Sequence, residues 1–264
     1  MLPESLTMLM NHEPDNQAVS LHLLNNTGAV HALVPFHDAY KAISDIAAAS
    51  GLLGDERITL TLLLVLRCRY TLDKGILEVL RLHGGDAYHV LRQAIEAVGS
   101  ADLVRRKPPL VKVWLAAGSN DEAYRQYRNA FQTDQRLPKD DPLTNDLRSW
   151  YGRASKLAHD SIFGFAGRLQ IVRETQRMTI GFGYADGLPD QDQAKTAGAV
   201  LSHLRNHLEV HLLILRTFAR ALDSALQHDQ ARWDAALATA STAWDNLKAL
   251  IDAGRLTAPG STAP

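Results

Sequence analysis

The amino-acid sequence predicts an all-α protein: a bundle of six to seven helices with one small β-hairpin at about residues 167–184. Apolar residues recur every three or four positions through most of the chain, which is the period of an amphipathic helix. Gly, Pro and capping residues separate these stretches. Only residues 163–184 break the period, because they are rich in Phe, Ile, Val and Thr and are punctuated by glycines.

The first half of the chain contains clear helical periods. One helix is expected over residues 35–50, and Gly51 is placed to end it. Asp55 is placed to cap a second helix, whose apolar stripe continues to Leu82. A third helix is expected from residue 87, because Gly-Gly-Asp at residues 84–86 can end one helix and begin the next.

The second half alternates helical stretches with breaks. Pro108 and Pro109 must break or kink the third helix, which restarts briefly at residues 110–117. A hairpin is expected from two β-like segments at residues 167–173 and 177–184. The remaining helices are expected at residues 119–132, 143–158, 193–226 and 229–253.

These elements predict one helical domain over residues 31–254, because no internal repeat or low-complexity linker divides it. Residues 1–30 mix Asn, Asp, Pro and His without a clear period, so an irregular N-terminal arm is expected there. Residues 255–264 end in a run of small residues, and a flexible tail is expected.

Composition bears on several classes of function. The formal net charge is −1, whereas a protein that binds nucleic acid by electrostatics alone is usually strongly basic. The single cysteine, Cys68, lies in an apolar helical run, which favours an inert buried thiol. No signal peptide is recognisable, and the longest uncharged apolar run, residues 58–66, is far shorter than a membrane span of about 20 residues. We expect a cytoplasmic protein with no membrane contact and no cofactor.

A polar line precedes the β-like segment. Tyr151, Ser155 and His159 are spaced four apart, so a helix places them on one face. Arg92 and Glu96, an i,i+4 pair on the third helix, are expected to face this line across the bundle. Such a network could bind a small anion, with His159 as acid, base or anion contact. It could equally be a structural clamp between helices.

The same segments carry a resemblance. Arg92-x3-Glu96 followed by Ser155-x3-His159-x-Ser161 resembles a group of uncharacterised bacterial helical proteins, over about residues 60–225. The resemblance implies an all-helical bundle without an assigned activity. The sequence departs from that group where His159 is followed by Asp rather than Pro.

A histidine ladder lies in the long helix expected at residues 193–226. His203, His207 and His211 are spaced i, i+4 and i+8 and share one face. Two such histidines can hold a divalent metal ion, as in a metal-dependent hydrolase. No third ligand can be identified, although one near Glu209 or on another helix would be needed. The alternative is a polar seam beside the leucines of the same helix.

The ladder overlaps a second motif. Arg205-Asn206-x4-His211 resembles the Arg-polar-x4–6-His motif of the HEPN superfamily of helical ribonucleases and nucleotide-binding proteins. The resemblance implies a site in which Arg and His from two subunits meet at a dimer interface and act on RNA without a metal. Arginine can stabilise the phosphorane charge and histidine can move the proton. Arg153-x5-His159 fits the same spacing but lacks the polar residue after the arginine.

These patterns lead to one favoured hypothesis and two alternatives. The favoured hypothesis is a helical-bundle protein that binds a partner or small anionic ligand in a polar pocket around His159. The alternatives are a HEPN-like ribonuclease that uses Arg205 and His211, and a metal-dependent hydrolase that uses the histidine ladder. A homodimer is plausible, and the partner could be RNA or another protein.

Overall fold

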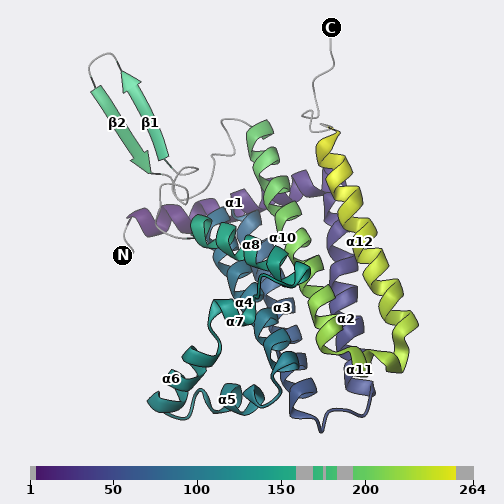
Figure 1. Ribbon diagram of the computed structural model, residues 1–264. Coiled ribbons are helices and arrows are strands. Elements are labelled where there is room, and N and C mark those ends of the chain that lie inside the picture. The colour runs from purple at the N-terminus through teal and green to yellow at the C-terminus, as the bar shows by residue number, and fades with distance from the viewer. Residues whose placement is uncertain (1–3, 159–168, 175–176, 183–192, 254–264) are drawn as a thin grey trace.

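The computed structural model describes residues 4–158, 169–174, 177–182 and 193–253, and confirms the all-α class (Figure 1). The long helices are α1 (Glu4–Thr27), α2 (Leu33–Ala49), α3 (Glu56–Leu80), α4 (Gly84–Arg106), α8 (Pro142–Ala158), α10 (Gln193–Ala221) and α12 (Gln230–Asp252). The short ones are η1 (Ala29–Ala32), α5 (Leu110–Ala116), α6 (Asp121–Ala130), α7 (Thr133–Arg136), α11 (Asp223–Leu226) and η2 (Gln227–Asp229). Two strands, β1 (Leu169–Glu174) and β2 (Arg177–Phe182), pair antiparallel with Leu169 opposite Phe182.

The described residues hold more helices than the six to seven expected. Among the described residues, the additional helices are α1 and the single turns η1, α7, α11 and η2 in the connections. Pro108 and Pro109 end α4, since proline lacks the amide hydrogen that a helix interior needs. Asn120 then starts α6 by accepting a hydrogen bond from the Ala123 N–H at 2.9 Å. Isolated turns of this kind have too few residues to show an apolar period.

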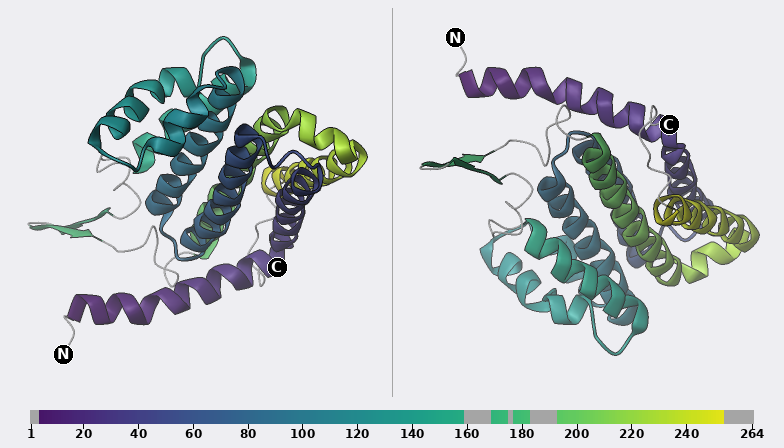
Figure 2. Two further views of the ribbon diagram at one scale, coloured as in Figure 1. Left: turned by 90° about the horizontal axis from the view of Figure 1, so that it is seen from below. Right: turned by 90° about the horizontal axis from the view of Figure 1, so that it is seen from above.

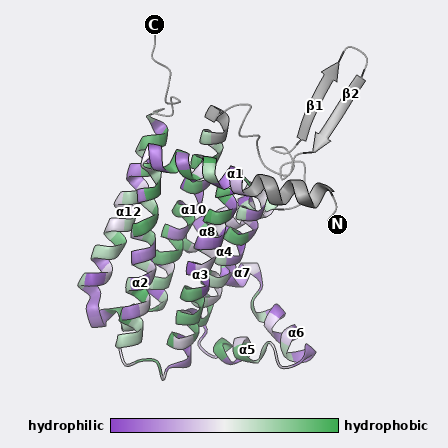
Figure 3. Cartoon of the chain, turned by 180° about the vertical axis from the view of Figure 1, so that it is seen from behind, coloured by the Kyte–Doolittle hydropathy of each residue, from purple (hydrophilic) through white to green (hydrophobic). Residues whose placement is uncertain are grey.

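The core forms where α4 packs against α3, α8 and α10, and α2 packs against α12. Figure 2 shows α5 and α6 on one side of the α3–α4 pair, with α2 and α12 on the other. Apolar and polar residues alternate along the long helices (Figure 3). Buried leucine, isoleucine and phenylalanine side chains each contribute about 1.5–3 kcal/mol on leaving water. None of the described helices is long and apolar enough to cross a membrane.

The expectation of an irregular N-terminal arm is wrong for residues 4–27, which form α1. This helix runs across one end of the bundle (Figure 1). Within residues 14–27, where side-chain burial is described, the buried side chains are Asn16, Ser20 and Leu24, one turn apart, and two of these three are polar. The buried face therefore produces no apolar period in the sequence, and Pro14 inside the helix adds a misleading break. The expected tail at residues 255–264 lies outside the described residues.

Gly75 of α3 permits a close approach of α3 to His207 of α10. A Cβ atom there would lie 2.9 Å from Cδ2 and 3.0 Å from Nε2 of His207, which is fully buried. Real Cβ atoms essentially never lie so close to another heavy atom, so either the His207 ring or the helix would have to shift. The ring cannot move easily, because it is packed in the core. The absence of a side chain at position 75 therefore sets the spacing of these two helices.

We expect Gly75→Ala to lower the free energy of unfolding by about 1–2 kcal/mol, because the overpacking outweighs the gain in helix propensity. Gly152→Ala in α8 is the matched control, because nothing lies within 4 Å of a Cβ there. That control should raise the free energy by roughly 0.5–1 kcal/mol. Urea unfolding of both variants measures the difference, and equal effects would contradict the tight contact at Gly75.

Candidate functional site

Glu96 of α4 is the centre of a polar cluster formed by three helices. Tyr151 of α8 donates a hydrogen bond from Oη to Glu96 Oε1 at 3.1 Å. Arg92 Nε lies 3.8 Å from the same oxygen, and Arg136 Nη1 of α7 lies 3.7 Å from Oε2. The structure thus brings Arg92, Glu96 and Tyr151 together and adds Arg136. The i,i+4 spacing accounts for the shared face of Arg92 and Glu96.

The two arginines keep hydrogen-bonding capacity to spare. At 3.7 and 3.8 Å their contacts with Glu96 are ion pairs, too long for hydrogen bonds. Nε of Arg92 and Nε of Arg136 are both buried and have no hydrogen-bond partner among the described residues. A buried N–H donor without an acceptor is unfavourable by about 1–3 kcal/mol, so an anion that supplied the acceptor would be stabilised here.

The other members of the predicted pocket are less informative. Ser155 is half-buried on α8, one turn after Tyr151. His159 lies outside the described residues, so the role expected for it stays a prediction. The cluster that the structure does describe is therefore centred on Glu96 of α4, and it draws its second arginine from α7.

A cleft of about 350 Å³ opens beside Glu96. It lies between α3 and α4 on one side and α5 to α7 on the other, so Arg67, Trp114, Tyr127 and Arg136 line it together with Glu96. Tyr127 stacks on Phe131 with ring centroids 4.8 Å apart, which holds the aromatic wall in place. The cleft combines two guanidinium groups, one carboxylate and two aromatic side chains, so its charged groups sum to a positive charge.

Sequence reasoning missed the α5–α7 side of this cleft. Arg136 falls in a stretch expected to be a loop, and no periodic pattern links it to Glu96, forty positions earlier. Trp114 lies in the short helix expected at residues 110–117, and nothing in the sequence links it to Glu96. The signal that was present is the concentration of arginine and aromatic residues between positions 114 and 136, which gains meaning only when these helices fold onto α4.

The histidine ladder faces the core. His207 and His211 are fully buried, and His203 is half-buried. His207 Nδ1 lies 3.0 Å from the carbonyl oxygen of His203, and its Nε2 lies 3.1 Å from that of Ala87. Burial lowers the pKa of His207 to about 4, although both carbonyl contacts act in the opposite direction. At neutral pH the ring is uncharged, so only one of its nitrogens can donate.

His211 is held by a different partner. Its Nδ1 is hydrogen-bonded to Tyr40 Oη at 2.7 Å, and its Nε2 is buried without a hydrogen-bond partner among the described residues. Burial, reinforced by the nearby His207 and His37, lowers the pKa of His211 well below its usual value. Burial also raises the pKa of Tyr40, so the phenol stays protonated. This pair links α2 to α10 inside the core.

This geometry does not favour either use proposed for the long helix. A ribonuclease would need Arg205 and His211 on one accessible cleft, whereas His211 is fully buried and bonded to Tyr40. Asn206 is engaged too, since it donates a hydrogen bond from Nδ2 to Tyr88 Oη at 2.8 Å. For a metal site, both ring nitrogens of His207 face carbonyl oxygens, and no metal-ligand group of three among the described residues includes the ladder.

Cys68 is not placed to act as a nucleophile. The thiol is fully buried and lies 3.5 Å from the carbonyl oxygen of Ala94, to which it donates a weak hydrogen bond. Burial raises the pKa of Cys68 well above its usual value, so no thiolate nucleophile forms near neutral pH.

In comparisons with known proteins, no family model, no curated protein and no solved structure matches this chain.

Proposed function

We propose that this protein binds a small anionic ligand that carries a planar ring, in the cleft beside Glu96. Support comes mainly from Arg136, which lines the cleft with its guanidinium group only partly paired. Its side chain is 12% exposed, and its one ion-pair partner among the described residues is Glu96, at 3.7 Å. A cation that is nearly buried, weakly paired and placed on a cleft wall is suited to hold an anion.

The chemistry of the walls defines the class of ligand. Arg67 is exposed, lines the same cleft and forms no salt bridge within the described part of the chain, so its positive charge remains available to a ligand. Trp114 and Tyr127 offer flat apolar surfaces on which a ring can stack. The volume of about 350 Å³ suits a small molecule rather than a peptide or a polynucleotide. Glu96 can accept a hydrogen bond from an amino or hydroxyl group of the ligand.

The proposal is tested by calorimetric titration of the full chain with adenosine 5′-monophosphate, benzoate, adenosine and inorganic phosphate. The two ring-bearing anions should bind at millimolar concentration or below, and at least about tenfold more tightly than the probes that carry only the ring or only the charge. Arg136→Gln should weaken binding of the ring-bearing anions about tenfold, since a charged hydrogen bond contributes roughly 1.5–3 kcal/mol.

The matched control is Arg125→Gln. Arg125 lies on α6 close to the cleft in sequence, but its side chain is 72% exposed and pairs with Glu122 outside the lining. This variant should bind like the unmodified protein. Failure of both ring-bearing anions to bind would overturn the proposal, as would equal binding by Arg136→Gln and the unmodified protein.

A further inference from the structure

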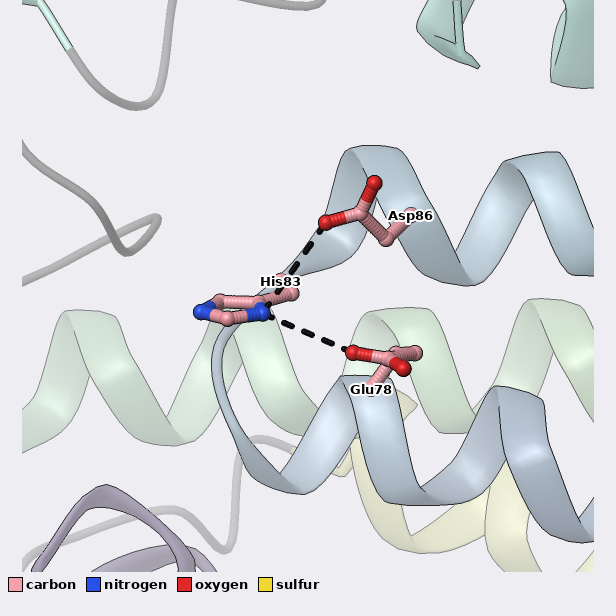
Figure 4. A group of neighbouring side chains, drawn as sticks. All are labelled: Glu78, His83 and Asp86. Atoms are coloured by element: carbon pink, nitrogen blue, oxygen red, sulfur yellow. Dashed lines mark ion pairs between the residues drawn. The ribbon is translucent and has the colours of Figure 1, made fainter. Parts of the chain in front are cut away.

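Three potential metal ligands converge at the turn between α3 and α4 (Figure 4). Glu78 comes from the last turns of α3, His83 from the connection, and Asp86 from the first turn of α4. One ligand atom from each lies within 4.8 Å of the others. His83 Nδ1 is 3.5 Å from Glu78 Oε2 and 3.9 Å from Asp86 Oδ2. No other such group of three occurs in the described ranges.

The backbone of the turn fixes the relative positions of these ligands. The His83 N–H donates a hydrogen bond to the Glu78 carbonyl oxygen at 2.8 Å, and the His83 carbonyl oxygen accepts one from the Ala87 N–H at 2.9 Å. Leu82 adopts a φ of +61°, an uncommon conformation for a residue with a side chain, which allows the chain to reverse. His83 precedes the first residue of α4 without capping it through its side chain, so the imidazole is not engaged with the helix end.

We propose that Glu78, His83 and Asp86 bind a divalent transition-metal ion of the Zn²⁺ type. One imidazole and two carboxylates are a donor set that such ions accept, whereas Ca²⁺ and Mg²⁺ prefer oxygen alone. Two ligands that each lie about 2.1 Å from a tetrahedral ion are about 3.4 Å apart. The separations of 3.5 and 3.9 Å between His83 and the two carboxylates lie near this value, and all three ligand atoms are within 4.8 Å of one another, so the side chains must draw together by at most about 1.4 Å to enclose an ion.

The local charges are compatible with a cation. Arg81 Nη1 lies 3.7 Å from Glu78 Oε1, the oxygen that does not face His83. The guanidinium group thus balances part of the carboxylate charge and leaves Oε2 directed at the imidazole. Glu78 and His83 are mostly buried, with side chains 12% and 13% exposed, while Asp86 is open to solvent. Solvent on the Asp86 side would supply the remaining ligand as water.

This inference is independent of the ligand cleft. Asp86 precedes Glu96 by ten residues on the same helix, a rise of about 15 Å along α4. The ion would join the end of α3 to the start of α4. It would stabilise the folded chain in proportion to its concentration relative to the dissociation constant.

The test is calorimetric titration of the metal-free full chain with ZnCl₂, followed by melting curves with and without the ion. Zn²⁺ should bind the unmodified protein with one high-affinity equivalent and should raise the melting temperature. His83→Ala and Asp86→Asn should each weaken that equivalent at least tenfold, because even loss of an outer hydrogen-bond partner of a metal ligand weakens binding by about 10–100-fold. Asp86→Asn changes a side chain that is exposed to solvent, so this variant should fold. It therefore tests the site even if His83→Ala does not fold.

The matched control is His89→Ala, since His89 is an exposed histidine of α4 that is hydrogen-bonded only to Gln93 in the described structure. It should titrate like the unmodified protein. Retention of the high-affinity equivalent in folded Asp86→Asn and His83→Ala would overturn the assignment, and so would a titration with no equivalent stronger than millimolar. Co²⁺ absorption gives a second readout: a visible band of low-coordinate Co²⁺ should appear in the unmodified protein and be lost in both variants.

Discussion

The free energy of unfolding should fall by about 2 kcal/mol between pH 7 and pH 5 from His207 alone, because the pKa of this buried ring is about 4 in the folded chain. His211, whose pKa is also lowered by burial, should add to the loss in the same direction. The two imidazoles belong to α10 and are fully buried in the protein core. Protonating either ring would place a positive charge away from water, which is unfavourable.

The direction follows from proton binding in the two states. An unfolded histidine takes up its proton near pH 6.5, whereas folded His207 takes it up only near pH 4. Between these values the unfolded chain holds more protons, so stability rises with pH and is lost as pH falls. Above pH 6.5 the contribution is complete, and below about pH 4 the loss from His207 levels off. The carboxylates with lowered pKa values, Asp45, Asp55 and Asp141, act mainly below this window.

Urea unfolding at half-unit steps from pH 7 to pH 5 measures this slope. His207→Gln keeps an amide that can contact the Ala87 carbonyl oxygen but cannot titrate, so its slope should be smaller by about one proton. A flat profile for the unmodified protein, or equal slopes for His207→Gln and the unmodified protein, would contradict the assignment.

Asp102→Asn should lower the free energy of unfolding by about 3 kcal/mol. Asp102 is a fully buried carboxylate at the end of α4, and its oxygens accept hydrogen bonds from Arg105 Nε at 3.0 Å, Arg106 Nε at 2.9 Å and Arg220 Nη2 at 2.9 Å. The amide would leave three guanidinium groups around a neutral side chain. Because the arginines keep some exposure to solvent, the effect should lie at the lower end of the about 3–5 kcal/mol typical of broken buried pairs.

The control for this experiment is Asp134→Asn, which removes an ion pair to Arg148. The Asp134 side chain is 76% exposed, and exposed pairs contribute about 0–1 kcal/mol. Thermal and urea unfolding of both variants at pH 7 separate the two cases. Equal losses would show that the buried network around Asp102 contributes no more than a surface pair. The same network accounts for Arg105 and Arg106, whereas Lys107 donates a hydrogen bond to Gln135 Oε1 instead.

The partial success of the sequence prediction can be traced to particular residues. Arg92 and Glu96 are four apart on a helix that shows a strong apolar stripe, so their shared face was predictable. The same rule aligned His203, His207 and His211 correctly but could not say which way the face points. The structure turns His207 and His211 into the core, where Tyr40 from α2 is hydrogen-bonded to His211 and the Ala87 carbonyl from α4 contacts His207.

By itself, the sequence determined the all-α class and the main helices, because apolar period and end signals act within a few residues of one another. Only the tertiary structure decided that Arg136 joins Glu96, that Gly75 admits His207, and that Arg220 reaches Asp102. These partners are separated by 40 residues or more, and no local period encodes such contacts. They arise from the packing of α7 and α10 against α4 and of α10 against α3, which brings together side chains that lie far apart in the sequence.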